Sequence, residues 1–423
     1  MYLTLQMFMN TMMRQEGKVI NSNSMPLKKI IGKLHLWLGV TSGLIVFIIA
    51  ITGCIYAFQE EIQSLTQPYR YVEAQNKAFL PPSRIREITD AQLPGKHIHG
   101  IMYQGKEQSA KAIYFSFEDN YYDFVYVNPY MGEVLKVKDE YQDFFRIVLD
   151  GHFYLWLPPE IGQPVIATTT LIFVVMLISG LFLWWPRNKN GARQRFSIKW
   201  NARWRRKNYD LHNVLGFYIS GIALILALTG LTWGFEWFKA AVYKTAGGEK
   251  SLVYSEPPSD TTALAATDTQ AAMSAGANPV DLLWRKMQVR YPEAESIEMH
   301  FPESELSPIH VAVNPDASTY WEIDYLYFDQ YTLAEIQGDN IWDRFDNASS
   351  ADKLMRLNYD IHTGAIMGLP GKILAFFASL LCASLPVTGF VMWYGRRKKA
   401  PKITKQVLPS AGTPAVLLKR QKI

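Results

Sequence analysis

Four long apolar stretches interrupt a chain that is otherwise rich in polar residues. Their cores, at 36–58, 165–185, 214–235 and 373–394, contain no Asp, Glu, Lys or Arg, and each is long enough to cross the roughly 30 Å hydrocarbon core of a bilayer as a helix. Buried helices of a water-soluble protein fit uncharged runs of this length poorly. The pattern therefore predicts four transmembrane helices, at 34–58, 163–185, 212–238 and 369–394.

Positive charge predicts the orientation of these helices. The segments 1–33, 186–211 and 395–423 hold 23 of the 43 Lys and Arg residues but only 2 of the 38 acidic residues. By the positive-inside rule these segments are cytoplasmic, and the long loops 59–162 and 239–368 face outward. The basic middle loop fits topology and contact with anionic lipid headgroups better than nucleic-acid binding. We therefore expect a multi-pass protein of the bacterial inner membrane with both termini in the cytoplasm.

The two halves of the chain share one sequence plan. At a shift of 177 residues the third apolar stretch aligns with the first, and the ends of the second and fourth stretches also agree. Because each half crosses outward and back, the repeat is parallel about an axis along the membrane normal, and it predicts a pseudo-symmetric four-helix bundle. The aligned positions include His35 with His212, Thr52-Gly53 with Thr229-Gly230, and Ser179-Gly180 with Thr388-Gly389.

Both outer loops have the pattern of small α+β domains. In the first loop, residues 112–118 and 123–127 alternate in polarity like strands, and the turn at 128–132 leads into a third strand. In the second loop an amphipathic helix is expected at 280–290. Strands follow near 296–301, 308–314 and 321–328. The predicted fold is thus an integral membrane four-helix bundle with two extracytoplasmic α+β domains.

Four of the eight histidines occupy matching positions near the ends of the predicted spans. His35 and His212 begin the first and third spans, and His152 and His362 precede the second and fourth. Imidazole is the usual axial ligand of haem iron, and two imidazoles from facing helices give a six-coordinate, electron-transferring haem. A single histidine at a membrane interface is more often a hydrogen-bonded anchor, but two symmetric pairs favour two haem groups, one at each face.

These groups are expected to be haem b, held without covalent bonds. Both cysteines, Cys54 and Cys382, lie in predicted spans, and no CxxCH motif for covalent attachment is present. No catalytic residue beyond the haem ligands is expected. Three of the histidines follow an aspartate by two residues, and these carboxylates could accept the second imidazole N–H and orient the ring. They are Asp150, Asp210 and Asp360.

Two other histidines, His97 and His99, lie two residues apart and would share one face of a strand. They could bind a metal ion or a substrate, although a solvated pair is the more common situation. His300 and His310 have no spacing that points to a site.

Several of these motifs resemble the PepSY-associated transmembrane family. The similarity spans about residues 28–400, and the turns at 128–134 and 329–333 resemble the PepSY modules of that family. The first turn has Asn where Asp is usual, and the second lacks Pro and Gly. Members include haem-containing reductases of ferric siderophores, so the resemblance implies this fold, compartment and activity. The other motifs are His35-Leu-Trp-Leu-Gly39, Thr52-Gly53, His362-Thr-Gly364, Gly368-Leu-Pro-Gly-Lys372 and Thr388-Gly389 with Trp393-Tyr394.

The preferred hypothesis from the sequence is a transmembrane reductase that serves iron acquisition. Electrons would come from quinol or a cytoplasmic partner, because no nucleotide or flavin motif is visible, and would reduce iron(III) in a periplasmic ferric siderophore. Two alternatives stay open. A siderophore permease is disfavoured by spans that lack ionisable residues apart from terminal histidines. A membrane-anchored PepSY binding or regulatory module would have no redox activity.

Overall fold

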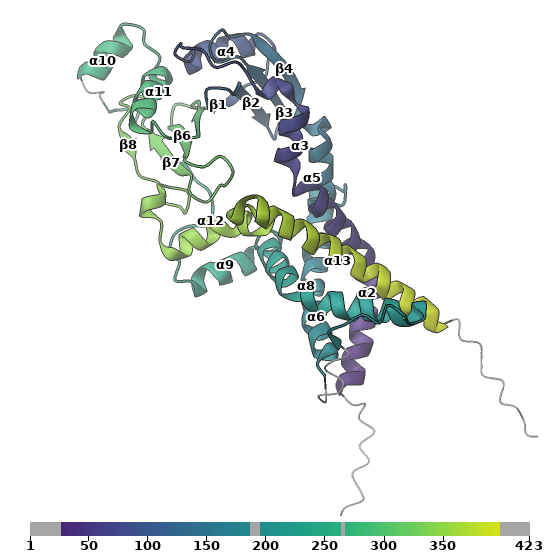
Figure 1. The fold of residues 1–423 in the computed structure, drawn as a ribbon. Coiled ribbons are helices and arrows are strands. Elements are labelled where there is room, and N and C mark those ends of the chain that lie inside the picture. Colours follow the sequence, from purple (N-terminus) through teal and green to yellow (C-terminus); the bar gives the residue numbers. More distant parts are fainter. Residues whose placement is uncertain (1–26, 187–194, 264–266, 398–423) are drawn as a thin grey trace, which may run out of the picture.

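The computed structural model describes residues 27–186, 195–263 and 267–397 (Figure 1). Within these ranges four helices are long and apolar enough to cross a membrane. A candidate membrane-spanning helix is therefore present at each of the four predicted positions, while most of the predicted terminal segments and part of the basic middle loop lie outside the described residues. The four helices are α2 (Leu27–Tyr56), α6 (Pro159–Trp184), α8 (Trp204–Gly234) and α13 (Gly368–Arg397).

The four long helices contact one another in a ring, in the order α2, α6, α8, α13 and back to α2. Lipid tails give helices no hydrophobic reason to associate, so small residues that permit close packing become important. At Gly43 of α2, an added Cβ would lie 3.3 Å from the Cβ of Pro386 on α13. Buried Ala50, Ala223 and Ala378 serve the same close packing further along the helices.

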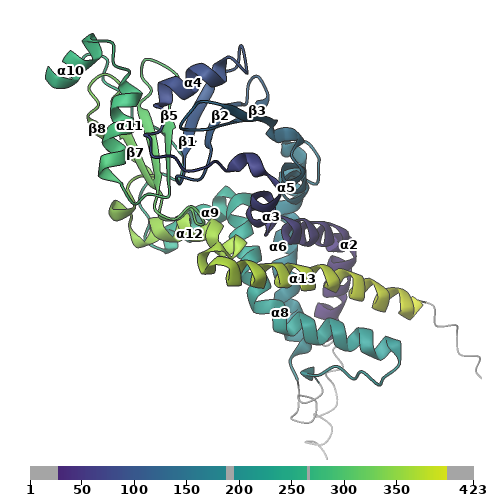
Figure 2. The same cartoon turned by 45° about the horizontal axis from the view of Figure 1, so that its top comes forward.

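The two outer loops form one antiparallel sheet of eight strands, which corrects the prediction of two separate domains (Figure 2). The order is β4-β3-β2-β1-β5-β6-β7-β8, with four strands from each loop. At the junction β1 pairs with β5, so that Gly100 faces His300 and Tyr103 faces Ile297. Either loop alone would leave an open strand edge at this position. The strands are β1 (Ile98–Tyr103), β2 (Ala110–Ser116), β3 (Tyr121–Val127), β4 (Val134–Asp139), β5 (Ser296–His300), β6 (Ile309–Asn314), β7 (Asp324–Phe328) and β8 (Glu335–Ile336).

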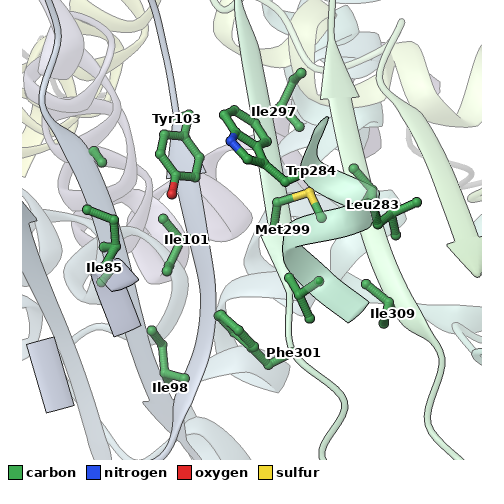
Figure 3. Packing of buried hydrophobic residues seen from close by; sticks show 14 of the residues in the cluster. Ile85, Ile98, Ile101, Tyr103, Leu283, Trp284, Ile297, Met299, Phe301 and Ile309 are labelled. Carbon is green, nitrogen blue, oxygen red and sulfur yellow. The ribbon is translucent and has the colours of Figure 1, made fainter. Parts of the chain in front are cut away.

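Helices α4 (Pro82–Asp90) and α11 (Pro279–Arg290) cover the face of the sheet that points away from the long helices (Figures 1 and 2). The backbone N–H of Ser83 donates to Oδ1 of Asp281 at 2.9 Å and joins the two helices. Beneath them Trp284 stacks on Tyr103 with ring centres 4.1 Å apart, in a core that both loops share (Figure 3). The opposite face of the sheet, here called the bundle-facing face, points toward the long helices (Figure 1).

The turns after β3 and β7 have the same hydrogen bonds although their sequences differ. Asn128 N–H donates to the carbonyl of Glu133, and Asp329 N–H donates to that of Ala334. The fifth residue of each turn has positive φ, which glycine adopts readily: Gly132 at 76° and Leu333 at 56°. The second turn thus keeps the shape of the first without Pro or Gly, because Leu333 takes the left-handed conformation.

Short helices connect the sheet to the long helices. Two of them, α5 (Phe144–Tyr154) and α12 (Ser350–Thr363), run into α6 and α13 and were not predicted. The Asp143 side chain caps α5, and Ser349 and Asp352 form a capping box on α12. The other short helices are α3 (Gln59–Thr66), α9 (Glu236–Thr245) and α10 (Thr267–Ser274), with 3-10 turns at Pro68–Arg70, Glu140–Gln142, Phe345–Asn347 and Ala365–Met367.

Candidate cofactor-binding site

A small cavity at the sheet end of the long helices, here called the sheet-proximal cavity, is lined by His152 and His362. Its volume is about 280 Å³, and its other lining residues are mostly apolar. The two imidazole rings project from α5 and α12, with centres 6.2 Å apart and planes at 68°. This ring spacing fits a single metal ion bound between the two Nε2 atoms, at about 2 Å from each. The predicted pairing of His152 with His362 therefore agrees with the geometry.

A larger cavity, here called the sheet-distal cavity, is lined by His35 and His212 and has a volume of about 870 Å³. These two histidines belong to the long helices α2 and α8 themselves. Three basic residues, Lys28, Arg195 and Arg396, also line this cavity. No Lys or Arg is among the described residues that line the sheet-proximal cavity. The structure thus sorts the four histidines into the two predicted pairs.

The two cavities lie back to back. Val46 of α2 and Phe173 of α6 line both of them. A single layer of side chains therefore separates the cavities at this point, within the ring of long helices. A pair of cofactors bound here would be close neighbours in an apolar medium.

Each of the four histidines is held in the same way by a neighbouring long helix. Its Nδ1 atom lies within hydrogen-bonding distance of a Ser or Thr hydroxyl. The backbone carbonyl three residues before that hydroxyl residue also contacts the imidazole, and for His152 it accepts from Nδ1 at 3.0 Å. The Nδ1–Oγ distances are 2.9 Å for His35–Ser179, 3.2 Å for His152–Thr52, 2.9 Å for His212–Thr388 and 2.9 Å for His362–Thr229. The carbonyls belong to Met176, Ile49, Leu385 and Leu226 in the same order.

These contacts assign the tautomer of the rings. At His152 the carbonyl of Ile49 can only accept a hydrogen bond, so Nδ1 must carry the proton. The hydroxyls give the same assignment for all four rings, because each donates its own hydrogen to a carbonyl of its helix, as Thr229 does to Ile225 at 2.8 Å, and can then only accept from Nδ1. Nε2 then keeps its lone pair, and no described residue hydrogen-bonds Nε2 of these four rings. Metal-binding histidines commonly donate the other N–H to a backbone carbonyl in this manner.

A glycine follows each of the four hydroxyl residues and lies against the ring. A Cβ added at these glycines would be only 3.2 to 3.5 Å from Cε1 of the histidine. At Gly53 this contact is tighter than an ordinary van der Waals contact, and at the other three glycines the added Cβ would just touch the ring. The Ser/Thr-Gly pairs are thus parts of the site, which the sequence showed only as markers of the repeat: Thr52-Gly53, Ser179-Gly180, Thr229-Gly230 and Thr388-Gly389.

The three aspartates do not orient the histidines, which corrects that prediction. Asp150 pairs with Arg146 at 3.2 Å and Asp210 with Arg206 at 2.8 Å. Asp360 accepts the backbone N–H of Tyr320 at 3.1 Å. The reason is helical geometry: positions two residues apart differ by about 200° around the helix and point to opposite sides.

The protonation state of the two histidines in the sheet-proximal cavity suits metal binding. Burial, with a smaller effect of nearby His152, lowers the pKa of His362 to about 3. Burial also lowers the pKa of His152 below its ordinary value. Both imidazoles are therefore neutral near pH 7, which is the form that binds a metal.

Together these observations fit a haem group held by two imidazoles in each cavity. The fit rests on four Nε2 atoms with free lone pairs, on rings fixed in orientation, and on apolar walls of the kind that surround bound cofactors. The basic residues of the sheet-distal cavity would suit the two carboxylates of haem b.

The other four histidines lie in or beside the sheet. His97 is exposed, as expected for a solvated residue. His99 does not pair with it but contacts His300, which in turn contacts His310. His99, His300 and His310 thus form a cluster in space that their spacing in the sequence did not indicate.

Comparison with protein families identifies the family of the chain. A family model described as PepSY-associated TM region matches residues 33–396. The matched segment contains all four cavity histidines and the whole sheet. No curated protein matches the chain.

Proposed function

Because the chain belongs to the family of PepSY-associated TM regions, we propose that it is a reductase that carries electrons across the inner membrane to a ferric siderophore. The observation that carries this proposal is the pair of cavities, each lined by two histidines with tethered Nδ1 atoms. A helix that only anchors a binding domain needs no such cavity.

In this proposal His35 and His212 hold one haem b, and His152 and His362 hold a second. The bound group would supply reversible one-electron iron chemistry, and the two histidines of each cavity would both be used to hold it. The Ser/Thr hydroxyls and backbone carbonyls keep each ring in one orientation and one tautomer. Rigid ligands need little rearrangement when the charge of the bound iron changes, which favours fast electron transfer.

The apolar residues of the long helices exclude water. They also hold the two sites at a short distance from each other. Val46 and Phe173 separate the cavities by one layer of side chains. Crossing a roughly 30 Å hydrocarbon core in two short steps is far easier than in one long step. This wall therefore supports the electron path without supplying any chemistry of its own.

Aromatic side chains connect the sheet-proximal cavity to the space beneath the sheet. The ring of Trp233 is 5.2 Å from His362 and 6.4 Å from Tyr359, and Tyr359 is 5.0 Å from Tyr320. We propose that the ferric siderophore docks against this group of rings. One electron converts its iron(III) to iron(II), which the hard oxygen donors of siderophores bind more weakly.

We further propose that the sheet lies in the periplasm and the sheet-distal cavity near the cytoplasmic face, as the charge distribution predicts. Electrons would then enter near His35 and His212 from quinol or a cytoplasmic partner.

The test is a visible absorption spectrum of the detergent-purified chain, oxidised and then reduced with dithionite, with haem measured per chain. We expect about two haem groups with two axial imidazoles each. The double variants His152→Ala/His362→Ala and His35→Ala/His212→Ala should each lose about one of them. His97→Ala, which removes an exposed imidazole outside the cavities, should lose none.

Reoxidation of the reduced protein by a ferric hydroxamate then tests the acceptor. A coloured protein that no ferric chelate reoxidises would contradict the siderophore reductase. A colourless protein after expression with ample haem would contradict the electron path itself and favour the membrane-anchored binding or regulatory module.

A further inference from the structure

Three histidines from distant parts of the chain lie side by side on the bundle-facing face of the sheet. The ring centres of His99 and His300 are 4.7 Å apart, and those of His300 and His310 are 4.4 Å apart. They belong to β1, β5 and β6, which are adjacent strands. We call these three residues the histidine row.

The register of the sheet explains the row. Gly100 pairs with His300 across β1 and β5, and Met299 pairs with Val311 across β5 and β6. These pairings place His99 and His310 on either side of His300. Because side chains alternate along a strand, the burial of Met299 in the helix-covered core turns His300 to the opposite face. The row exists only because the two loops share one sheet.

His310 has an unsatisfied nitrogen in the interior. Its side chain is 7% exposed, and its Nε2 atom is buried without a hydrogen-bond partner. The ring lies between those of His300, 4.4 Å away, and Tyr327, 4.9 Å away. Buried polar atoms nearly always have a partner, so an unpartnered nitrogen beside the imidazole of His300 points to a ligand.

Carboxylates border the row on three sides. Oε1 of Glu298 is 3.5 Å from Nε2 of His300, and Oε1 of Glu256 is 3.8 Å from Nδ1 of His310. Oε1 of Glu303 is 3.4 Å from Nδ1 of His99. Imidazole nitrogens beside carboxylate oxygens are donors that can bind a metal cation.

We propose that His99, His300 and His310, together with Glu298, bind a first-row divalent transition-metal ion such as Zn²⁺ or Fe²⁺. Imidazole and one carboxylate are a donor set that these ions prefer, whereas Ca²⁺ and Mg²⁺ select oxygen ligands. Within the described residues no three such side chains already converge on one point. Binding therefore requires the imidazole rings to turn so that their nitrogens converge on one point.

This site is separate from the two cavities and does not depend on bound haem. None of its four residues lines either cavity. It lies on the sheet face that points to the end of the long helices where a ferric chelate is proposed to dock.

Zinc is the probe that tests the proposal, because its X-ray absorption edge is distinct from that of haem iron. Chelator-treated full-length protein is dialysed against Zn²⁺, the bound metal is counted, and the zinc ligands are determined from the absorption fine structure. We expect one tight ion per chain with two or three imidazole ligands, roughly tetrahedral in arrangement. His310→Gln and the double variant His99→Gln/His300→Gln should bind at least about tenfold more weakly.

His97→Ala is the matched control, because it removes an exposed imidazole near the same strand. It should bind Zn²⁺ as the wild type does. The His152→Ala/His362→Ala variant should also bind Zn²⁺ normally, which separates this proposal from the reductase. Equal zinc binding in all variants, or a zinc shell without imidazole, would overturn the site. If His310→Gln fails to fold, the test rests on zinc binding by the His99→Gln/His300→Gln variant, whose two residues are less buried than His310.

Discussion

The sheet-proximal cavity takes its histidines from two short helices outside the spans, whereas the sheet-distal cavity takes them from the spanning helices α2 and α8. The distal cavity is larger and basic, while the described lining of the proximal cavity has no Lys or Arg. Yet all four rings rest on the same unit of carbonyl, hydroxyl and glycine. The orientation of each imidazole is thus set by the helix that receives the ring, and the surroundings are free to differ between the two cavities.

The largest effect should come from closing the contact between α12 and α13, which supports only the proximal cavity. A Cβ on Gly371 would collide with the backbone carbonyl of Gly364, two residues after His362. Overpacking of this kind costs roughly 1–3 kcal/mol, and here the backbone itself must move. We expect Gly371→Ala to lose the proximal haem and keep the distal one, as measured by haem per chain and reduced spectra.

Gly221→Ala is the control for that substitution, because no atom lies within 4 Å of the added Cβ. It should leave both haem groups in place. Loss of both groups in Gly371→Ala would show that the cavities do not form independently.

The next largest effect should come from removing the Thr hydroxyl that accepts from Nδ1 of a cavity histidine. Thr229→Val removes the acceptor of His362 Nδ1 and leaves the carbonyl of Leu226, and Thr388→Val does the same for His212. Partners of this kind change metal affinity by about 10–100-fold. Each variant should release haem about tenfold faster from its own cavity, followed by transfer to an apo-protein acceptor.

Thr170→Val provides the comparison in the proximal cavity, since the Thr170 hydroxyl bonds only the carbonyl of Ile166. Unequal effects of Thr229→Val and Thr388→Val would mean that the distal cavity holds its cofactor by other contacts.

The sequence predicted the parts of this molecule that depend on local pattern. Uncharged runs predicted the spans, alternation predicted strands β2, β3, β5, β6 and β7, and the repeat predicted which histidines pair. The partners of the histidines could not be derived, because His362 and Thr229 are 133 residues apart. Nearby Asp360 was the natural local candidate, and only helix geometry excludes it. The pairing of β1 with β5 is equally non-local, so neither the single sheet nor the histidine row could be foreseen.

A smaller effect on haem binding should come from removing a basic residue that lines only the sheet-distal cavity. Arg195→Gln removes one of the basic residues that line the distal cavity. Partly solvated charge pairs contribute about 1 kcal/mol or less, so the distal haem should bind a few-fold more weakly, and the difference should shrink at high salt. Salt titrations of haem release would measure this. Arg205→Gln, at an exposed position of α8, removes the same charge and should change nothing.

The smallest effect extends the comparison to the two turns of the sheet. Burial alone would raise the pKa of the Asp329 carboxyl, but hydrogen bonds from the backbone amides of Asp260, Thr332 and Tyr331 outweigh it and hold the pKa below its ordinary value. Asn128 occupies the same place in the first turn and does not titrate.

A lowered carboxyl pKa adds stability above the unfolded value, near 4, that is lost as the pH falls through the folded value. Hydrogen exchange of residues 324–336 should therefore accelerate below about pH 4 more than its intrinsic rate predicts. In Asp329→Asn this extra loss should disappear, and Asn128→Asp should create it in residues 121–139. If both turns respond to acid alike in the wild type, the buried carboxylate of Asp329 is not what stabilises the second turn, and the left-handed Leu333 must be held by the packing of its side chain instead.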